Sequence, residues 1–168
     1  PADPLAREAD AEISVINNYF GIGLDAKVAM DFDTFRNENP GKCRSRMKNQ
    51  MWYTVMGTRE MLTQSCKGME KRLKLECDGV EIKLPKLQGI VILNINSYAA
   101  GANFWGNKVQ KKYRPPAYDD GLLEVLSIKG VTQMAASKSL PGVSPTRLAQ
   151  AAHIRITILP GDDVPIQV

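Results

Sequence analysis

Two asparagines, a tyrosine and two closely spaced glycines form the first stretch whose residue types suit a binding site. Residues 17–28 read NNYFGIGLDAKV and follow an apolar run at 13–16. The glycines permit positive φ angles or the close approach of another backbone, and Asp25 is suited to cap a helix that begins at Ala26. Gly-x-Gly also occurs in plain strand-to-helix turns, so a site and a turn both remain open. The third glycine of a dinucleotide-binding loop is absent.

A second polar stretch, NINSYAAGANFWG, covers residues 94–106 and follows an apolar run. It places Asn96 and Ser97 close to three aromatic residues. Such a mixture on a loop at a strand end suits recognition of a polar ligand. A structural interpretation is equally open, because amides and hydroxyls also hold tight turns, and Phe104 and Trp105 could simply cover the core.

A third candidate is the pair of adjacent carboxylates in Tyr118-Asp119-Asp120-Gly121. Carboxylate oxygens and backbone carbonyls together are typical ligands of hard cations. Asp-Asp-Gly is also an ordinary turn sequence, and that alternative remains open. The single histidine, His153, has no nucleophile or acid at a recognisable spacing, which favours a structural role.

The positive charge of the chain is concentrated in one segment. The whole sequence of 168 residues carries a net charge of +4, whereas residues 42–74 contain nine basic and two acidic residues. A local concentration of this kind can attract phosphates, anionic lipids or nucleic acid. It is also compatible with a solvated helix face. Nucleic acid is disfavoured, because the aromatic residues lie mostly outside the basic segment.

Hydropathy predicts an α+β fold: a β-rich, sandwich-like domain with two or three helices. We expect residues 1–12 to be a linker or tail and residues 13–168 to form one domain. No apolar run is long enough to span a bilayer, and no signal peptide is recognisable. Three widely spaced cysteines without a C-x-x-C motif predict reduced thiols. These features indicate a cytoplasmic protein.

Residue spacing predicts most elements individually. Apolar residues at spacings of three to five predict a helix, capped by Ser45, whose core face consists of Met47, Met51, Trp52, Val55 and Met56 and continues through Met61, Leu62 and Cys66. Alternation predicts a hairpin turning at 78–79. The remaining expectations are strands at 13–16, 88–95, 122–128, 154–159 and 164–168, a helix at 26–35, and a short helix after Ser144-Pro145 with Leu148, Ala151 and Ala152 inward.

Several long motifs together resemble the accessory domain of eukaryotic diacylglycerol kinases, most closely the delta/eta group. They are NNYFGIGLDAKVAMDF, SRMKNQMWYTVMGTREML, LQGIVILNINSYAAGANFWG, DDGLLEV and the closing VPIQV. The resemblance implies that the chain is the second half of a two-domain lipid kinase catalytic module. The complete enzyme would use ATP and Mg²⁺ to phosphorylate diacylglycerol to phosphatidic acid in lipid signalling.

The resemblance also implies that this chain is inactive alone. The family's nucleotide loop, Gly-Gly-Asp-Gly-Thr, belongs to the preceding catalytic domain and is absent here. Family chains usually continue into Asp-Gly-Glu, which would follow the last residue of this sequence. No catalytic residue is therefore expected within the chain. Its expected partners are that catalytic domain in the same polypeptide, diacylglycerol, and an anionic membrane surface to which the enzyme is recruited peripherally.

Three groups of residues carry the site expectations. Related bacterial lipid kinases imply a structural magnesium site at Asp120 with the carbonyls of Ala117 and Leu122. The residues expected to line the cleft are Asn17, Asn18, Tyr19, Gly21, Gly23, Asp25, Asn96 and Ser97. The expected membrane or anion patch consists of Arg44, Arg46, Lys48, Lys71 and Arg72, although another domain could cover the same surface. The alternative function is a non-catalytic β-sandwich module that binds lipid or protein.

Overall fold

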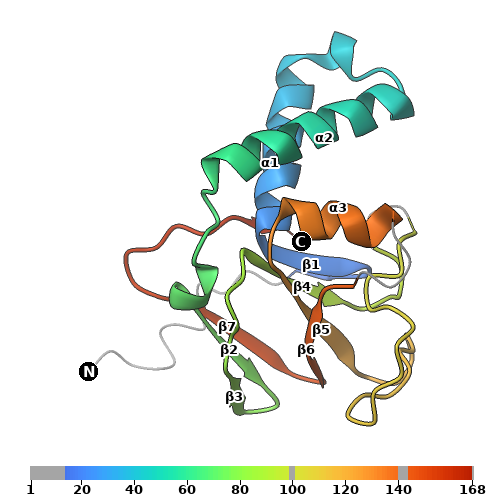
Figure 1. Cartoon of the computed structure of the whole chain (residues 1–168), viewed down its shortest axis with the longest axis vertical. Helices are drawn as coiled ribbons and strands as arrows, with labels where there is room; N and C mark the ends of the chain where they lie inside the picture. The colour runs from blue at the N-terminus through green and yellow to red at the C-terminus, as the bar shows by residue number, and fades with distance from the viewer. Residues whose placement is uncertain (1–13, 99–100, 140–143, 168) are drawn as a thin grey trace.

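Two antiparallel sheets and three α-helices make up the computed structural model, which describes residues 14–98, 101–139 and 144–167 (Figure 1). The helices gather on one side of the larger sheet, and the smaller sheet lies towards the other side. This arrangement confirms the expected α+β class. The large sheet has the order β6-β5-β4-β1-β8, with β1 (Tyr19–Gly23), β4 (Gly89–Leu93), β5 (Leu123–Ile128), β6 (Thr146–Ala151) and β8 (Ile166–Gln167).

The small sheet and the helices complete the fold. The order β3-β2-β7 joins β2 (Leu73–Cys77), β3 (Val80–Ile82) and β7 (Ile154–Ile158). The predicted hairpin is confirmed, with Asp78 and Gly79 both at positive φ in its turn, as two-residue hairpin loops require. The helices are α1 (Leu24–Glu38), α2 (Arg46–Thr63) and α3 (Val131–Ser139), with the short 3₁₀ turns η2 (Pro40–Lys42) and η3 (Met69–Lys71).

Strand β4 is the centre of the core. All five of its residues are buried, and it pairs with β1 on one side and β5 on the other. A strand that is covered on both faces is apolar throughout rather than alternating. The nearly continuous apolar run therefore correctly predicted a central strand. The aromatic pair Phe104 and Trp105 is also buried, as the structural interpretation of its loop expected.

Two predicted elements are wrong. The residues after Ser144-Pro145 form strand β6 rather than a helix, because they pair with β5 at the edge of the large sheet. The first strand begins at Tyr19, so the asparagines precede it and the two glycines lie within it. The sequence TRLAQA of β6 has no strong strand preference, and pairing with a neighbouring strand overrides its local tendency. Helix α3 was not predicted.

The N-cap of α2 is confirmed, but its predicted core face is wrong. The Ser45 hydroxyl accepts a hydrogen bond from the backbone N–H of Lys48 at 3.3 Å. Met56 and Cys66 are buried, but five residues of the expected core face are exposed: Met47, Met51, Val55, Met61 and Leu62. Periodicity identifies a helix, but it does not decide which side of the helix other elements cover. The three cysteines are free, as predicted.

Strand β1 passes into α1 where two backbones approach closely. Gly23 has a φ of 86°, and an added Cβ would lie 2.4 Å from the carbonyl oxygen of Gln88 and 3.0 Å from Cα of Gly89. The Leu24 N–H donates to the same Gln88 carbonyl at 2.9 Å. A side chain at residue 23 would therefore force β1 and β4 apart.

We expect Gly23→Ala to lower the free energy of unfolding by roughly 2–4 kcal/mol, because left-handed backbone strain adds to a backbone clash. Chemical denaturation of the purified chain measures this change. Gly41→Ala is the matched control, since a Cβ there meets no atom within 4 Å. It should change stability by less than about 0.5 kcal/mol. Equal effects of both substitutions would contradict the role of Gly23.

Candidate functional site

Four asparagines meet where β1 begins and β4 ends; we call Asn17, Asn18, Asn94 and Asn96 the asparagine edge. Antiparallel pairing of Tyr19 with Leu93 brings the two segments together. The Asn94 backbone N–H donates to the Asn18 carbonyl, and the Asn94 side chain donates to the Asn17 carbonyl, both at 2.9 Å. Two stretches that lie far apart in the sequence thus form one polar edge.

The loop that follows β4 extends this edge. The Asn96 side chain donates to the carbonyl of Pro116 at 3.3 Å. Asn96 and Ser97 are exposed, as are Asn17 and Asn18. The structure therefore unites four of the eight residues expected to line a cleft. Asn94 belongs to the same edge, although the sequence analysis did not select it.

An apolar cavity of about 770 Å³ adjoins the asparagine edge, and we call it the intersheet cavity. Asn94 belongs to both features. The cavity is lined from the large sheet by Phe20, Ile92 and Leu123, and from the small sheet by Glu76, Ile154 and Ile156. Sequence reasoning missed it because these residues come from strands that meet only in the folded chain. The arrangement offers polar groups beside an apolar space, which suits a ligand with both characters.

Of the other expected cleft residues, Tyr19 adjoins the asparagine edge, whereas Gly21, Gly23 and Asp25 lie further along the chain. Gly21, Gly23 and Asp25 are buried, and Tyr19 is half-buried. Gly23 lies at the opposite end of β1 from the asparagine edge, about 13 Å along the strand. Asp25 does not cap α1 either, since Gly23 occupies the N-cap position and makes no side-chain cap. These residues build the interior of the domain and do not form a loop at a cleft.

Asp25 has a tertiary partner in place of the predicted capping role. The Tyr98 hydroxyl, buried beneath the loop after β4, donates a hydrogen bond to the Asp25 carboxylate. Burial, and then the nearby Asp25 charge, raise the pKa of Tyr98 well above its ordinary value. The pKa values of Tyr19 and Tyr53 are raised for the same two reasons. The buried Asp25 carboxylate therefore links α1 to the loop after β4 through Tyr98.

The Asp119-Asp120 pair forms a turn. One carboxylate oxygen of Asp120 accepts the backbone N–H of Leu122 at 3.0 Å, and Gly121 has a φ of 71°. Within the described residues, no group of three or more His, Cys, Asp or Glu side chains could hold a metal ion. An ion at Asp120 would therefore depend on backbone carbonyls such as those of Ala117 and Leu122. The magnesium site stays a prediction.

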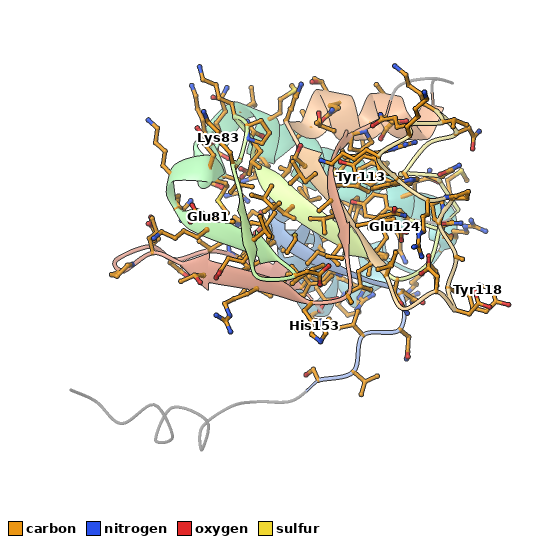
Figure 2. The ribbon with its side chains drawn as sticks, turned by 90° about the horizontal axis from the view of Figure 1, so that it is seen from below. Glu81, Lys83, Tyr113, Tyr118, Glu124 and His153 are labelled. Carbon is orange, nitrogen blue, oxygen red and sulfur yellow. The ribbon has the colours of Figure 1, made fainter. Side chains whose placement is uncertain are left out.

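A buried glutamate lies near this turn, and the sequence analysis missed it. Glu124 in β5 is 1% exposed and accepts a hydrogen bond from the Gln150 side chain at 3.1 Å. Its burial raises the pKa of the carboxyl, and the neighbouring Asp120 charge adds to this effect. Figure 2 shows Glu124 among the strands, whereas Tyr118 points outward. The sequence did contain a signal for this buried glutamate, because Glu124 is the only acid in the otherwise mostly apolar stretch LLEVLSI at residues 122–128.

The five basic residues of the expected patch do not form one surface. Arg44, Arg46 and Lys48 are exposed around the start of α2. Lys71 lies beyond the other end of this 18-residue helix, which is about 27 Å long. Arg72 pairs with the Asp162 carboxylate at 2.9 Å and also donates to the Asp163 carbonyl, so it has a structural role.

Comparison with known proteins identifies the family. The model of the diacylglycerol kinase accessory domain matches residues 15–168. The chain belongs to this family. Diacylglycerol kinase eta of Drosophila mojavensis is 52% identical to this accessory domain over 159 residues, which cover 94% of the chain and 8% of that protein. Diacylglycerol kinase kappa of Homo sapiens is 52% identical over 158 residues, 94% of the chain and 12% of that protein.

The accessory domain thus spans roughly a tenth of the length of these curated relatives. The resemblance found in the sequence, including the similarity to the eta group, is confirmed. No solved structure matches the chain. None of the helices in the described residues is long and apolar enough to cross a membrane.

We expect Tyr98→Phe to lower the free energy of unfolding of the accessory domain by about 1–3 kcal/mol, because it removes a donor from a buried carboxylate. Thermal or chemical denaturation measures the loss. Tyr118→Phe removes a hydroxyl from a tyrosine that is 82% exposed and should have no effect. Wild-type stability of Tyr98→Phe would show that this hydrogen bond does not hold the fold.

We expect Glu124→Gln to change the pH dependence of stability. The folded-state pKa of Glu124 is raised above its ordinary value of 4.5. The protonated Glu124 carboxyl therefore contributes its full stability below about pH 4.5, and this contribution is lost as the pH rises through the raised folded-state pKa. The amide keeps an acceptor for Gln150 and cannot ionise. The variant should equal the wild type at low pH and be more stable at neutral pH.

Denaturation across a pH series tests this expectation. Glu81→Gln alters an exposed glutamate on β3, labelled in Figure 2, and should leave the pH profile unchanged. A constant difference between Glu124→Gln and the wild type at every pH would contradict the assigned pKa direction.

Proposed function

We propose that this accessory domain forms the half of a diacylglycerol kinase active-site cleft that does not hold the nucleotide loop. The proposal rests first on family membership, since the matched relatives are named diacylglycerol kinases. The complete enzyme would transfer the terminal phosphate of ATP to the free hydroxyl of diacylglycerol and release phosphatidic acid. This accessory domain lacks the Gly-Gly-Asp-Gly-Thr loop and would be inactive alone.

The juxtaposition of the asparagine edge and the intersheet cavity is the structural observation that carries the proposal. Diacylglycerol presents one hydroxyl next to long apolar chains. Side-chain amides of Asn17 and Asn18 are exposed beside a cavity lined by Phe20 and Ile92. The amides could orient the hydroxyl by hydrogen bonds, while the cavity accommodates apolar atoms near the glycerol.

A cleft shared by two domains suits this reaction. Phosphoryl transfer depends on positioning, charge neutralisation and exclusion of water rather than on covalent help from the protein. The accessory domain would contribute positioning and exclusion of water. ATP and Mg²⁺ would act mainly through the preceding domain, with Mg²⁺ neutralising phosphate charge there. A second, structural Mg²⁺ could bind Asp120 together with the carbonyls of Ala117 and Leu122.

The proposed setting is a cytoplasmic enzyme that is recruited peripherally to a membrane, where its lipid substrate lies. The competing candidate is a binding module without a catalytic role. The intersheet cavity is the observation that favours the binding module, because an apolar cavity can hold lipid without any reaction. The kinase half and the binding module differ in one prediction: only the kinase half phosphorylates lipid when the catalytic domain is added.

Lipid phosphorylation from radiolabelled ATP tests the proposal on three polypeptides: this chain, the chain extended through Asp-Gly-Glu, and that extension joined to the preceding catalytic domain. We expect activity only in the joined polypeptide. Turnover by this chain alone would overturn the proposed division of labour. A silent joined polypeptide together with lipid binding by this chain would favour the binding module.

Within the joined polypeptide, we expect Asn18→Ala to lower kcat/KM about tenfold, which corresponds to about 1.4 kcal/mol of transition-state stabilisation. Its melting temperature should not change, because Asn18 is exposed. Asn37→Ala removes an exposed asparagine from α1 and is the matched control. Equal activity of the two variants would remove the asparagine edge from the proposed site.

A further inference from the structure

Helix α2 exposes a row of apolar side chains, Met47, Met51, Val55 and Leu62, which we call the outer α2 stripe. Their exposed fractions are 81%, 52%, 44% and 77%. At 3.6 residues per turn, these four positions fall within an arc of about 80°. Single exposed apolar residues are normal, but four on one helix face, interrupted only by Thr58, indicate a surface that another body covers.

The outer α2 stripe lies opposite the face by which α2 packs on the domain. Met56, Gly57 and Glu60 are the buried residues of α2. The Glu60 carboxylate accepts hydrogen bonds from the Ser65 hydroxyl at 2.8 Å and the Cys66 N–H at 3.1 Å. Figure 1 shows α1 and α2 extending beyond the sheets, which leaves the outer side of α2 accessible.

Positive charge borders the outer α2 stripe. Lys48 and Arg59 are exposed and lie along one side of it on the helix surface. Arg44 and Arg46 are exposed around the start of the helix. The only acid within α2 is the buried Glu60. The outer face of the helix therefore combines apolar and cationic side chains and presents no negative charge.

We propose that the outer α2 stripe docks on an anionic membrane surface, with its apolar side chains at the boundary between head groups and acyl chains and its basic border on lipid phosphates. Amphipathic helices that lie in this boundary combine an apolar face with Lys and Arg. Unbranched methionines adapt to an irregular, mobile environment. A protein partner is the less favoured occupant, because it would have to supply matching acids around an apolar ridge.

This inference deepens the proposed function, since it rests on a lipid substrate that remains in the membrane. It keeps Lys48 of the patch expected from sequence, adds Arg59, and leaves out Arg72, which is held by Asp162.

Sedimentation of the purified chain with vesicles tests the docking directly and without ATP. We expect binding to vesicles of phosphatidylcholine with phosphatidylserine, weak binding to phosphatidylcholine alone, and loss of binding as salt rises. Met51→Ser/Val55→Ser and, separately, Lys48→Ala/Arg59→Ala should each lower partitioning at least about tenfold. All proteins should keep the wild-type melting temperature.

Matched controls separate the stripe from general surface effects. Met30 on α1 is 49% exposed, close to the value for Met51, and Met30→Ser should bind like the wild type. Lys83→Ala should do the same, because Lys83 lies just after β3, and Figure 1 shows β3 at the other end of the domain from α2. Indifference to phosphatidylserine, or equal losses in the Met30 and Met51 variants, would overturn the proposal.

Two further outcomes would replace the membrane with a protein. Self-association in sedimentation velocity that Met51→Ser/Val55→Ser abolishes would identify a second copy as the occupant. Stripe-dependent binding of the preceding catalytic domain, without vesicle binding, would identify an interdomain contact. Either result would overturn membrane docking.

The docking and the proposed function fail in distinguishable ways. Activity of the joined polypeptide on detergent-solubilised diacylglycerol reports the kinase without a bilayer. Wild-type activity of Met51→Ser/Val55→Ser in detergent with a loss on vesicles would support both proposals. Stripe-dependent vesicle binding by a joined polypeptide that is inactive in detergent would leave the docking intact and reject the kinase cleft.

Discussion

The hydrogen bond from Tyr98 to the buried carboxylate of Asp25 joins parts of the chain that are 73 residues apart. Asp25 lies in the first turn of α1, and Tyr98 lies beneath the loop after β4, where it also stacks on Phe104. The Tyr98 hydroxyl lies 3.6 Å from the sulfur of Met134 in α3. A buried charge is costly unless hydrogen bonds compensate it, so the positions of these elements depend on one another.

This internal connection gives the two ends of β1 different roles. At the end where α1 begins, Gly21 leaves space for the Asp25 carboxylate and Gly23 allows close backbone contact with Gly89. At the start of the strand, the asparagine edge is exposed beside the intersheet cavity. The buried end of β1 thus anchors the strand, and the other end carries exposed polar side chains that are accessible to a ligand. Rigid elements commonly position binding groups on loops in this way.

Helix α2 has an unusual distribution of residue types for a surface helix. Its single acid, Glu60, is buried and accepts a hydrogen bond from the segment that follows the helix, while Met47 and Met51 are exposed among basic residues. Soluble helices normally place their apolar side chains against the core. This distribution agrees with the proposed docking of α2 on a membrane, in a domain that spans about a tenth of its relatives' length.

The sequence by itself determined the elements whose pattern is local: the β2–β3 hairpin, the buried strand β4 and the Ser45 cap of α2. It also selected Asn17, Asn18 and Asn96, although it placed the first two after a strand rather than before one and did not select Asn94. Only the tertiary structure decided which side of α2 is covered, that TRLAQA joins a sheet, and that Asp25 binds Tyr98 instead of capping α1. Each of these depends on groups distant in the chain, whose positions no local pattern records.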